Sequence, residues 1–152
     1  MNMKKLAALL CAMALCLAGL SALAEGTNSV EGEKAMQMMI GETPVMVAWE
    51  DNASVEALRA LAAEGLSIEM SMYGGFEQVG TIGQSLPRDD QQTTTASGDI
   101  VLYAGNQLVV FYGSNAWAYT RLGHITDQTP EQMQALLGSG DVTITLSCNL
   151  AD

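Results

Sequence analysis

The stretch "SGDIVLYAGNQLVVFYGSNAWAYTRLGHI", residues 97–125, contains three apolar segments separated by a Gly-Asn pair and a Ser-Asn pair. Such pairs favour reversals between antiparallel strands. In the middle segment, Leu108 and Val110 fall on one face of a strand, and Val109 and Phe111 fall on the other. A strand that is apolar on both faces is covered on both sides. We therefore expect one face to fill a core and the other to lie beneath a helix or a loop.

Further short segments with a period of two lie on either side of this stretch, and each is bounded by glycine or polar residues. Alternation of this kind predicts half-buried strands. The segments are "AMQMMIG" from residue 35, "TPVMVAWED" from residue 43, "LSIEMSMY" from residue 66, residues 76–82, and "DVTITLS" from residue 141.

Two segments have helical spacing instead. Asn52 or Ser54 can cap a short amphipathic helix that ends at Gly65, and Thr129 with Gln132 forms a capping box at the start of a second one. Many short strands, two short helices and no βαβ rhythm favour a closed or nearly closed β-barrel.

Residues 83–97 combine Pro87, acidic and amide side chains and three consecutive threonines. We expect a long surface loop here. Loops of this length in a compact domain tend to have a function, so this loop is a candidate lid.

The N-terminus combines Lys4 and Lys5 with an apolar run, followed by a small-residue cleavage signal that ends at Ala24. The apolar run is shorter than the roughly 20 residues of a spanning helix. This pattern predicts a secretory signal peptide over residues 1–24, a flexible linker over 25–35 and one domain over 36–148. A secreted or extracytoplasmic location is expected.

The formal net charge of the chain is −11. An acidic surface opposes binding to nucleic acid or to anionic membranes, because both interactions depend on Lys and Arg. We expect neither a nucleic-acid partner nor stable membrane insertion after signal cleavage. Cys148 is the only cysteine after the predicted signal, and no second histidine accompanies His124. No metal site and no cofactor are therefore expected.

Four segments follow one another between Met36 and Leu146: "EDNASVEALRAL", "YGGFEQVGTIGQSLP", "GDIVLYAGNQLVVFYG", and "YTRLGHI" leading into "LGSGDVTITL". In this order they resemble the bacterial cyclophilin-like fold proteins. The resemblance implies an all-β fold: a closed, eight-stranded cyclophilin-like β-barrel with two short helices that cover its open ends.

The resemblance implies less about function. True cyclophilins are peptidyl-prolyl isomerases that place an arginine over the prolyl amide, and no stretch of this chain matches that motif. No catalytic residue can therefore be carried over, because a shared fold does not establish a shared activity. Some relatives are joined to flavodoxin-like domains, which implies a possible redox protein as partner.

Five residues are candidates for a ligand-binding groove: Glu77, Tyr112, Trp117, Tyr119 and Arg121. Tyr119 and Arg121 lie two residues apart in a strand and so share a face, where an arginine flanked by aromatic rings can bind a carboxylate or a carbonyl. Glu77 follows a glycine pair that allows close backbone approach. The alternatives are an exposed, salt-bridged Arg121 and a structural Glu77.

In a regular strand His124 lies on the face opposite Arg121, so we expect the two side chains not to share a small site. The most direct interpretation of the whole chain is an exported, noncatalytic module that binds a small molecule or a peptide. Two alternatives stay open: a divergent peptidyl-prolyl cis-trans isomerase, and an accessory partner of a flavodoxin-like redox protein.

Overall fold

The computed structural model describes residues 35–149, so the predicted signal peptide and linker residues 25–34 lie outside it. The first strand begins at Ala35, the last residue assigned to the linker, and the last strand ends at Asn149. The elements are β1 (Ala35–Ile40), β2 (Thr43–Val45), β3 (Val47–Trp49), α1 (Ala53–Ala62), β4 (Leu66–Tyr73), β5 (Glu77–Thr81), β6 (Gln91–Thr94), β7 (Asp99–Tyr103), β8 (Gln107–Phe111), β9 (Ala116–Ile125), α2 (Pro130–Leu137) and β10 (Val142–Asn149).

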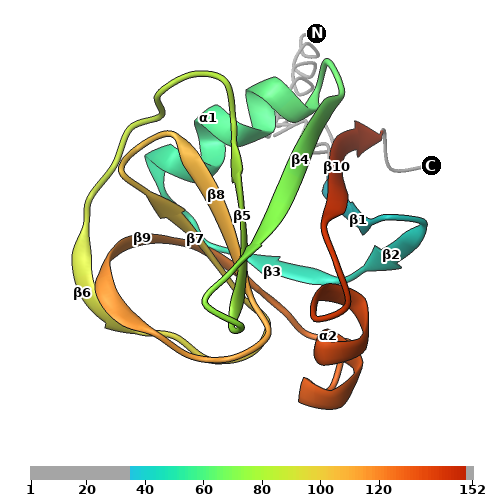
Figure 1. Cartoon of the computed structure of the whole chain (residues 1–152). Helices are drawn as coiled ribbons and strands as arrows, with labels where there is room; N and C mark the ends of the chain where they lie inside the picture. The colour runs from blue at the N-terminus through green and yellow to red at the C-terminus, as the bar shows by residue number, and fades with distance from the viewer. Residues whose placement is uncertain (1–34, 150–152) are drawn as a thin grey trace, which may run out of the picture. The chain divides into compact units, whose positions relative to one another are not determined.

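The strands form a nearly closed antiparallel barrel in the order β2-β1-β10-β4-β5-β8-β7-β9-β3 (Figure 1). Strands β2 and β3 are separated only by Met46, and β2 pairs with β1 whereas β3 pairs with β9. This interrupted strand therefore joins the two ends of the sheet. If β2 and β3 are taken as one strand and β6 is set aside, eight positions surround the barrel, as the cyclophilin-like barrel requires.

The two predicted helices are present, and both caps follow from the sequence. The Asn52 side chain accepts a hydrogen bond from the Val55 backbone N–H at the start of α1. At α2, Thr129 and Gln132 form the complete capping box, which satisfies backbone groups that would otherwise lack partners. Helix α1 lies at the top of the view in Figure 1 and α2 at the lower right. Within residues 35–149, no helix is long and apolar enough to cross a membrane.

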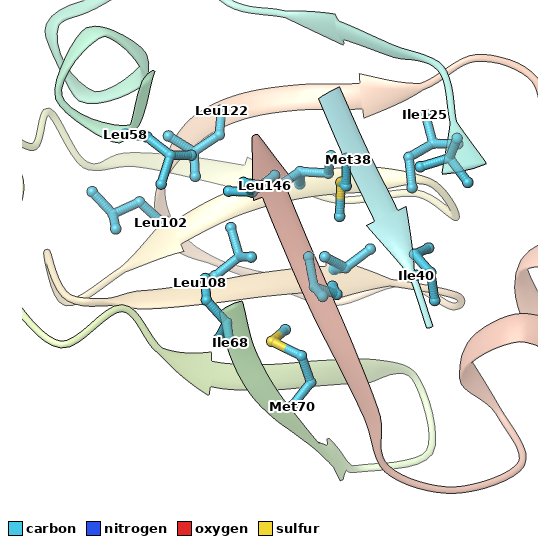
Figure 2. Packing of buried hydrophobic residues seen from close by; sticks show 14 of the residues in the cluster. Met38, Ile40, Leu58, Ile68, Met70, Leu102, Leu108, Leu122, Ile125 and Leu146 are labelled. Atoms are coloured by element: carbon cyan, nitrogen blue, oxygen red, sulfur yellow. The ribbon is translucent and has the colours of Figure 1, made fainter. Parts of the chain in front are cut away.

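The barrel interior contains the main hydrophobic core, which Figure 2 shows in part. It receives Leu58 from α1, Ile68 and Met70 from β4, and Leu146 from β10, all almost fully buried. Removing large aliphatic side chains from water is the main term that favours folding. Within residues 35–149 no disulfide adds to this core, because Cys148 is a free thiol.

A second, smaller cluster lies on the opposite face of the central strands. It consists of Val101, Val109, Phe111 and Tyr119, with Phe76 and Val79 packed against it. The neighbours of these residues, Leu108 and Val110, belong to the main core instead. The prediction that β8 is buried on both faces is therefore confirmed. We call this smaller group the outer cluster.

The prediction of one long surface loop over residues 83–97 is wrong. Residues Gln91–Thr94 form strand β6, which pairs with Ala116–Tyr119 of β9. The segment is also anchored by buried side chains at both ends, Leu86 and Thr95. The glutamine and threonine side chains of this segment are all polar, so the sequence shows no apolar alternation here. Backbone pairing with an exposed stretch of β9 does not require such alternation.

Candidate functional site

A pocket of about 420 Å³ lies over the outer cluster, and we call it the outer pocket. Its floor includes Val79 and Val109, which face each other across β5 and β8. Its volume falls within the roughly 300–1,000 Å³ of typical ligand pockets. The polar and aromatic residues around it are Tyr73, Glu77, Tyr103, Gln107, Asn115, Trp117 and Tyr119.

Strand pairing explains why these side chains meet, because residues directly opposite each other in antiparallel strands point to the same face. Tyr73 is paired with Glu77 across β4 and β5. Glu77 is paired in turn with Phe111 of the outer cluster. Tyr103 is paired with Gln107 across the turn between β7 and β8. The outer faces of four neighbouring strands thus form one side of the pocket.

Glu77 is the most unusual group in the pocket. The residue is only 6% exposed, and its Oε2 atom is buried without a hydrogen-bond partner among the described residues. Burial raises the pKa of Glu77 from 4.5 to about 7, because the charged carboxylate is desolvated. The carboxyl group therefore changes charge near neutral pH.

The raised pKa of Glu77 predicts that stability falls as the pH rises. The folded state binds the proton more tightly than the unfolded state, so this contribution is complete below about pH 4.5 and is lost as the pH passes about 7. We expect Glu77→Gln to become more stable relative to wild type between these values, by on the order of 2 kcal/mol. Urea unfolding of both proteins at pH 4.5, 6 and 8 measures this difference, and a difference that does not vary with pH contradicts the prediction.

Tyr119 connects the outer pocket to the outer cluster. Its residue is 4% exposed, and its ring makes edge contacts with Phe111, at 5.7 Å between centroids, and with Tyr103, at 6.1 Å. Its hydroxyl oxygen accepts a hydrogen bond from Asn115 Nδ2 at 3.0 Å. Burial raises the pKa of Tyr119, and the nearby Glu77 carboxyl adds to this effect. The ring is therefore a fixed wall of the pocket.

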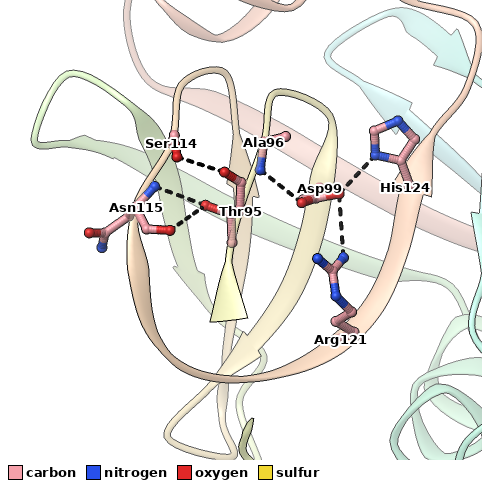
Figure 3. Close-up of polar contacts among 7 residues, drawn as sticks. All are labelled: Thr95, Ala96, Asp99, Ser114, Asn115, Arg121 and His124. Carbon is pink, nitrogen blue, oxygen red and sulfur yellow. Dashed lines mark hydrogen bonds and ion pairs between the residues drawn. The ribbon is translucent and has the colours of Figure 1, made fainter. Parts of the chain in front are cut away.

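Asn115 is itself fixed by the end of the β6 segment (Figure 3). Its backbone N–H donates to Thr95 Oγ1 at 2.9 Å, and its carbonyl oxygen accepts from the Thr95 N–H at 2.8 Å. Ser114 Oγ adds a hydrogen bond to the Thr95 carbonyl at 2.7 Å. These contacts hold the loop before β9 in place, so this side of the pocket is preorganised and does not depend on a mobile lid.

Two of the five predicted site residues lie elsewhere. Tyr112 is buried in the main core with Leu108 and Val110, because it follows them in the same alternation. Arg121 lines a separate pocket of about 340 Å³, next to Arg88 and the start of α1. The outer pocket thus contains Glu77, Trp117 and Tyr119 of the five predicted residues, and Tyr119 also borders the pocket that Arg121 lines.

The expectation that Arg121 and His124 cannot share a site is also wrong. Arg121 Nη1 lies 3.5 Å from Asp99 Oδ1, and His124 Nδ1 lies 2.8 Å from the same oxygen (Figure 3). The reason is a β-bulge: Ile100 pairs with Gly123 but Val101 pairs with Arg121, which leaves one extra residue in β9. The bulge shifts the alternation, so both side chains point toward Asp99.

This cluster around Asp99 has a structural role. The carboxylate is almost buried and also accepts a hydrogen bond from the Ala96 backbone N–H at 2.8 Å. It therefore fixes the turn before β7 and the bulged part of β9 together. Arg121 is 42% exposed at its side chain, which fits the alternative of a salt-bridged arginine at the surface.

Sequence reasoning missed six residues that line the outer pocket: Tyr73, Val79, Tyr103, Gln107, Val109 and Asn115. Tyr73 ends the polar face of "LSIEMSMY", and Tyr103 is the last residue of β7. Both could have been found from the alternation once the hairpin partners were known. The sequence indicates Asn115 only as a turn residue.

No group of three or more His, Cys, Asp or Glu side chains within residues 35–149 is arranged to hold a metal ion.

In comparisons with known proteins, a family model described as "Cyclophilin-like family" matches residues 38–147. No significant match was found among curated proteins or among solved structures.

Proposed function

The chain belongs to the cyclophilin-like family, and from this premise we propose that it is an exported, noncatalytic module that binds a small molecule or a short peptide in the outer pocket. The observation that carries the proposal is the buried carboxyl of Glu77, which lines a pocket with aromatic walls. A preformed pocket with apolar surface and a few converging polar groups is the usual form of a ligand site.

Two further features support a binding role. Trp117 lines the pocket and is 57% exposed. Removing a large aromatic ring from water is favourable, so a ligand that covers Trp117 would gain binding free energy. Glu77 carries an oxygen without a partner at the same place, and such a group has a desolvation cost that a ligand can offset. The pocket therefore combines apolar surface with a carboxyl group whose buried oxygen has no partner among the described residues.

The outer pocket does not supply the chemistry expected of a prolyl isomerase. Within residues 35–149, no arginine lines it, and Arg121, which lines the other pocket, is paired with Asp99. An arginine over the prolyl amide is the feature that the isomerase site needs. A binding role is therefore the better explanation of this pocket.

Export is supported by the sequence of the first 24 residues, with its paired lysines, apolar run and small-residue cleavage signal. Expression of the full chain with a C-terminal tag in a bacterial host tests it. We expect the tagged protein outside the cytoplasm, with a new N-terminus after Ala24. A full-length cytoplasmic product contradicts export and leaves the binding proposal unaffected.

An NMR experiment tests the binding role. We expect at least one member of a set of simple probes, comprising benzylamine, benzyl alcohol, benzoate and a capped Ala-Pro peptide, to shift the backbone amide signals of Glu77, Tyr103 and Tyr119. Trp117→Ala should weaken this binding about tenfold, because it removes an aromatic wall. Met46→Ala is the control, since Met46 is exposed and does not line the pocket.

Failure takes two distinct forms. If none of the four probes shifts the three signals, the outer pocket is not a ligand site and the proposal is wrong. If the wild-type protein accelerates cis-to-trans conversion of the Ala-Pro peptide, and Trp117→Ala removes the acceleration, the isomerase interpretation replaces it.

A further inference from the structure

The charges around the outer pocket are one-sided. Glu77 is its only carboxyl group, and among the described residues no lysine, arginine or histidine lines it. Its other polar groups are the neutral amides of Gln107 and Asn115 and the tyrosine hydroxyls. An anionic ligand would meet no positive group here and would be repelled by ionised Glu77.

The walls of the pocket add a second feature that favours a cation. Tyr73, Tyr103, Trp117 and Tyr119 come from three different strands and border the same space as Glu77. The faces of aromatic rings attract cations, and the attraction is largest when the cation is partly desolvated. Several aromatic rings around one carboxylate form a suitable receptor for an ammonium group that carries alkyl substituents.

The unpartnered oxygen of Glu77 gives the third argument. Glu77 Oε2 is buried and lacks a hydrogen-bond donor among the described residues. The other titratable residues that line the pocket, among those described, are Tyr73 on β4, Tyr103 on β7 and Tyr119 on β9. β8 contributes the uncharged Gln107 and Val109. No internal cation neutralises the carboxylate, so a bound cation would be its natural counter-ion.

We propose that the outer pocket binds an alkylammonium group, with the Glu77 carboxylate as counter-ion and the surrounding aromatic rings as a cage. This inference rests on the proposed function, because it names the ligand class of the same pocket. The ammonium group belongs to a small molecule or to a lysine side chain of a peptide, and both sources present the same chemistry.

Binding of such a cation is coupled to the ionisation of Glu77. Since the pKa of Glu77 is raised to about 7, the carboxyl is mostly neutral at pH 6 and mostly ionised at pH 8. Only the ionised form acts as a counter-ion. The affinity for a permanent cation should therefore rise about tenfold between pH 6 and pH 8.

Choline and 3,3-dimethylbutanol are suitable probes, because they have nearly the same shape but only choline is charged. In NMR titrations at pH 8, we expect choline to bind at least about tenfold more tightly than the neutral alcohol. A capped lysine amide, titrated in parallel, distinguishes the two sources of the ammonium group. Tighter binding of choline indicates a small-molecule ligand, and tighter binding of the lysine amide indicates a peptide ligand. Both results support recognition of an ammonium group.

Glu77→Gln is the decisive variant, since it keeps the shape of the side chain and removes its charge. We expect it to bind choline about tenfold more weakly at pH 8 and to lose the dependence on pH. Glu131→Gln is the matched control: it makes the same charge change at an exposed position of α2 outside the pocket and should bind like wild type.

Equal binding of choline and the neutral alcohol, or tighter binding of benzoate than of benzylamine, would overturn the ammonium assignment while the pocket remained a ligand site. Unchanged choline affinity in Glu77→Gln would overturn the role of the carboxylate as counter-ion. Absence of any probe from the pocket would remove both this inference and the function on which it rests.

Discussion

Phe111→Ala is expected to lower the free energy of unfolding by about 3 to 5 kcal/mol, the range typical of an emptied aromatic core site. Phe111 is fully buried, although it points away from the main core. Its ring packs edge-on against Tyr119, and the shared outer cluster also includes Val101 and Val109. Truncation leaves a cavity between strands that hydrogen bonds hold in register, so the site cannot collapse around it.

Arg121→Ala is the comparison for this variant. Its side chain is exposed to 42%, and Asp99 keeps its contacts with His124 and with the Ala96 backbone N–H when the guanidinium is removed. An exposed ion pair contributes about 1 kcal/mol or less. Urea unfolding of both variants measures the difference. A loss for Phe111→Ala as small as the one expected for Arg121→Ala would mean that the outer cluster is not a true core.

Gly80→Ala is expected to lower the free energy of unfolding by about 3 kcal/mol or more through overpacking. Gly80 lies in the middle of β5, where an added Cβ would come within 2.5 Å of the Glu69 carbonyl oxygen and of the Met70 sulfur, and within 2.6 Å of Ile68. Met70 can adjust, but a backbone oxygen in a barrel strand cannot. Strand β5 must therefore shift or lose part of its pairing.

The control for Gly80→Ala is Thr81→Ala, one residue later on the same strand. Thr81 is exposed, and its side chain only accepts a long hydrogen bond, 3.3 Å, from the Gly83 backbone N–H. We expect a loss of less than about 1 kcal/mol. Thermal unfolding followed by circular dichroism measures both variants, and a wild-type melting temperature for Gly80→Ala would contradict the close packing of β4 and β5.

Local patterns in the sequence were sufficient for most of the fold. The alternation in "LSIEMSMY" predicted β4 at its observed bounds, Leu66–Tyr73. The capping box at Thr129 predicted the start of α2, and the two apolar faces of β8 predicted two buried clusters. In each case the neighbouring residues contain the physical cause, so no knowledge of distant contacts was needed.

The features that the sequence did not predict depend on pairing between distant strands. The β-bulge opposite Ile100 changes which side chains of β9 share a face, and only the register of β7 against β9 reveals it. The sequence contains one signal of the bulge: the apolar residues Leu122 and Ile125 are three apart, and residues three apart lie on opposite faces of a regular strand. In the structure both are buried in the main core. Strand β6 likewise forms because β9 offers it a partner.

For the same reason, the sequence identified only three of the residues that line the outer pocket. Glu77, Trp117 and Tyr119 meet at the outer pocket, although they come from strands that are not neighbours in the sequence. The alternation that puts Leu108 and Val110 into the main core also applies to Tyr112, so its exclusion from the pocket was predictable. The position of Arg121 in another pocket required the three-dimensional structure.

Strand β6 also bears on how the domain avoids self-association. It pairs with β9 alone, so its other edge presents backbone groups without a strand partner in the described part of the chain. Exposed edges of this kind can recruit strands from other molecules and start aggregation or domain swapping. Here the edge is only four residues long and carries glutamine and threonine side chains. Such a short, polar edge is a poor template for amyloid-like growth.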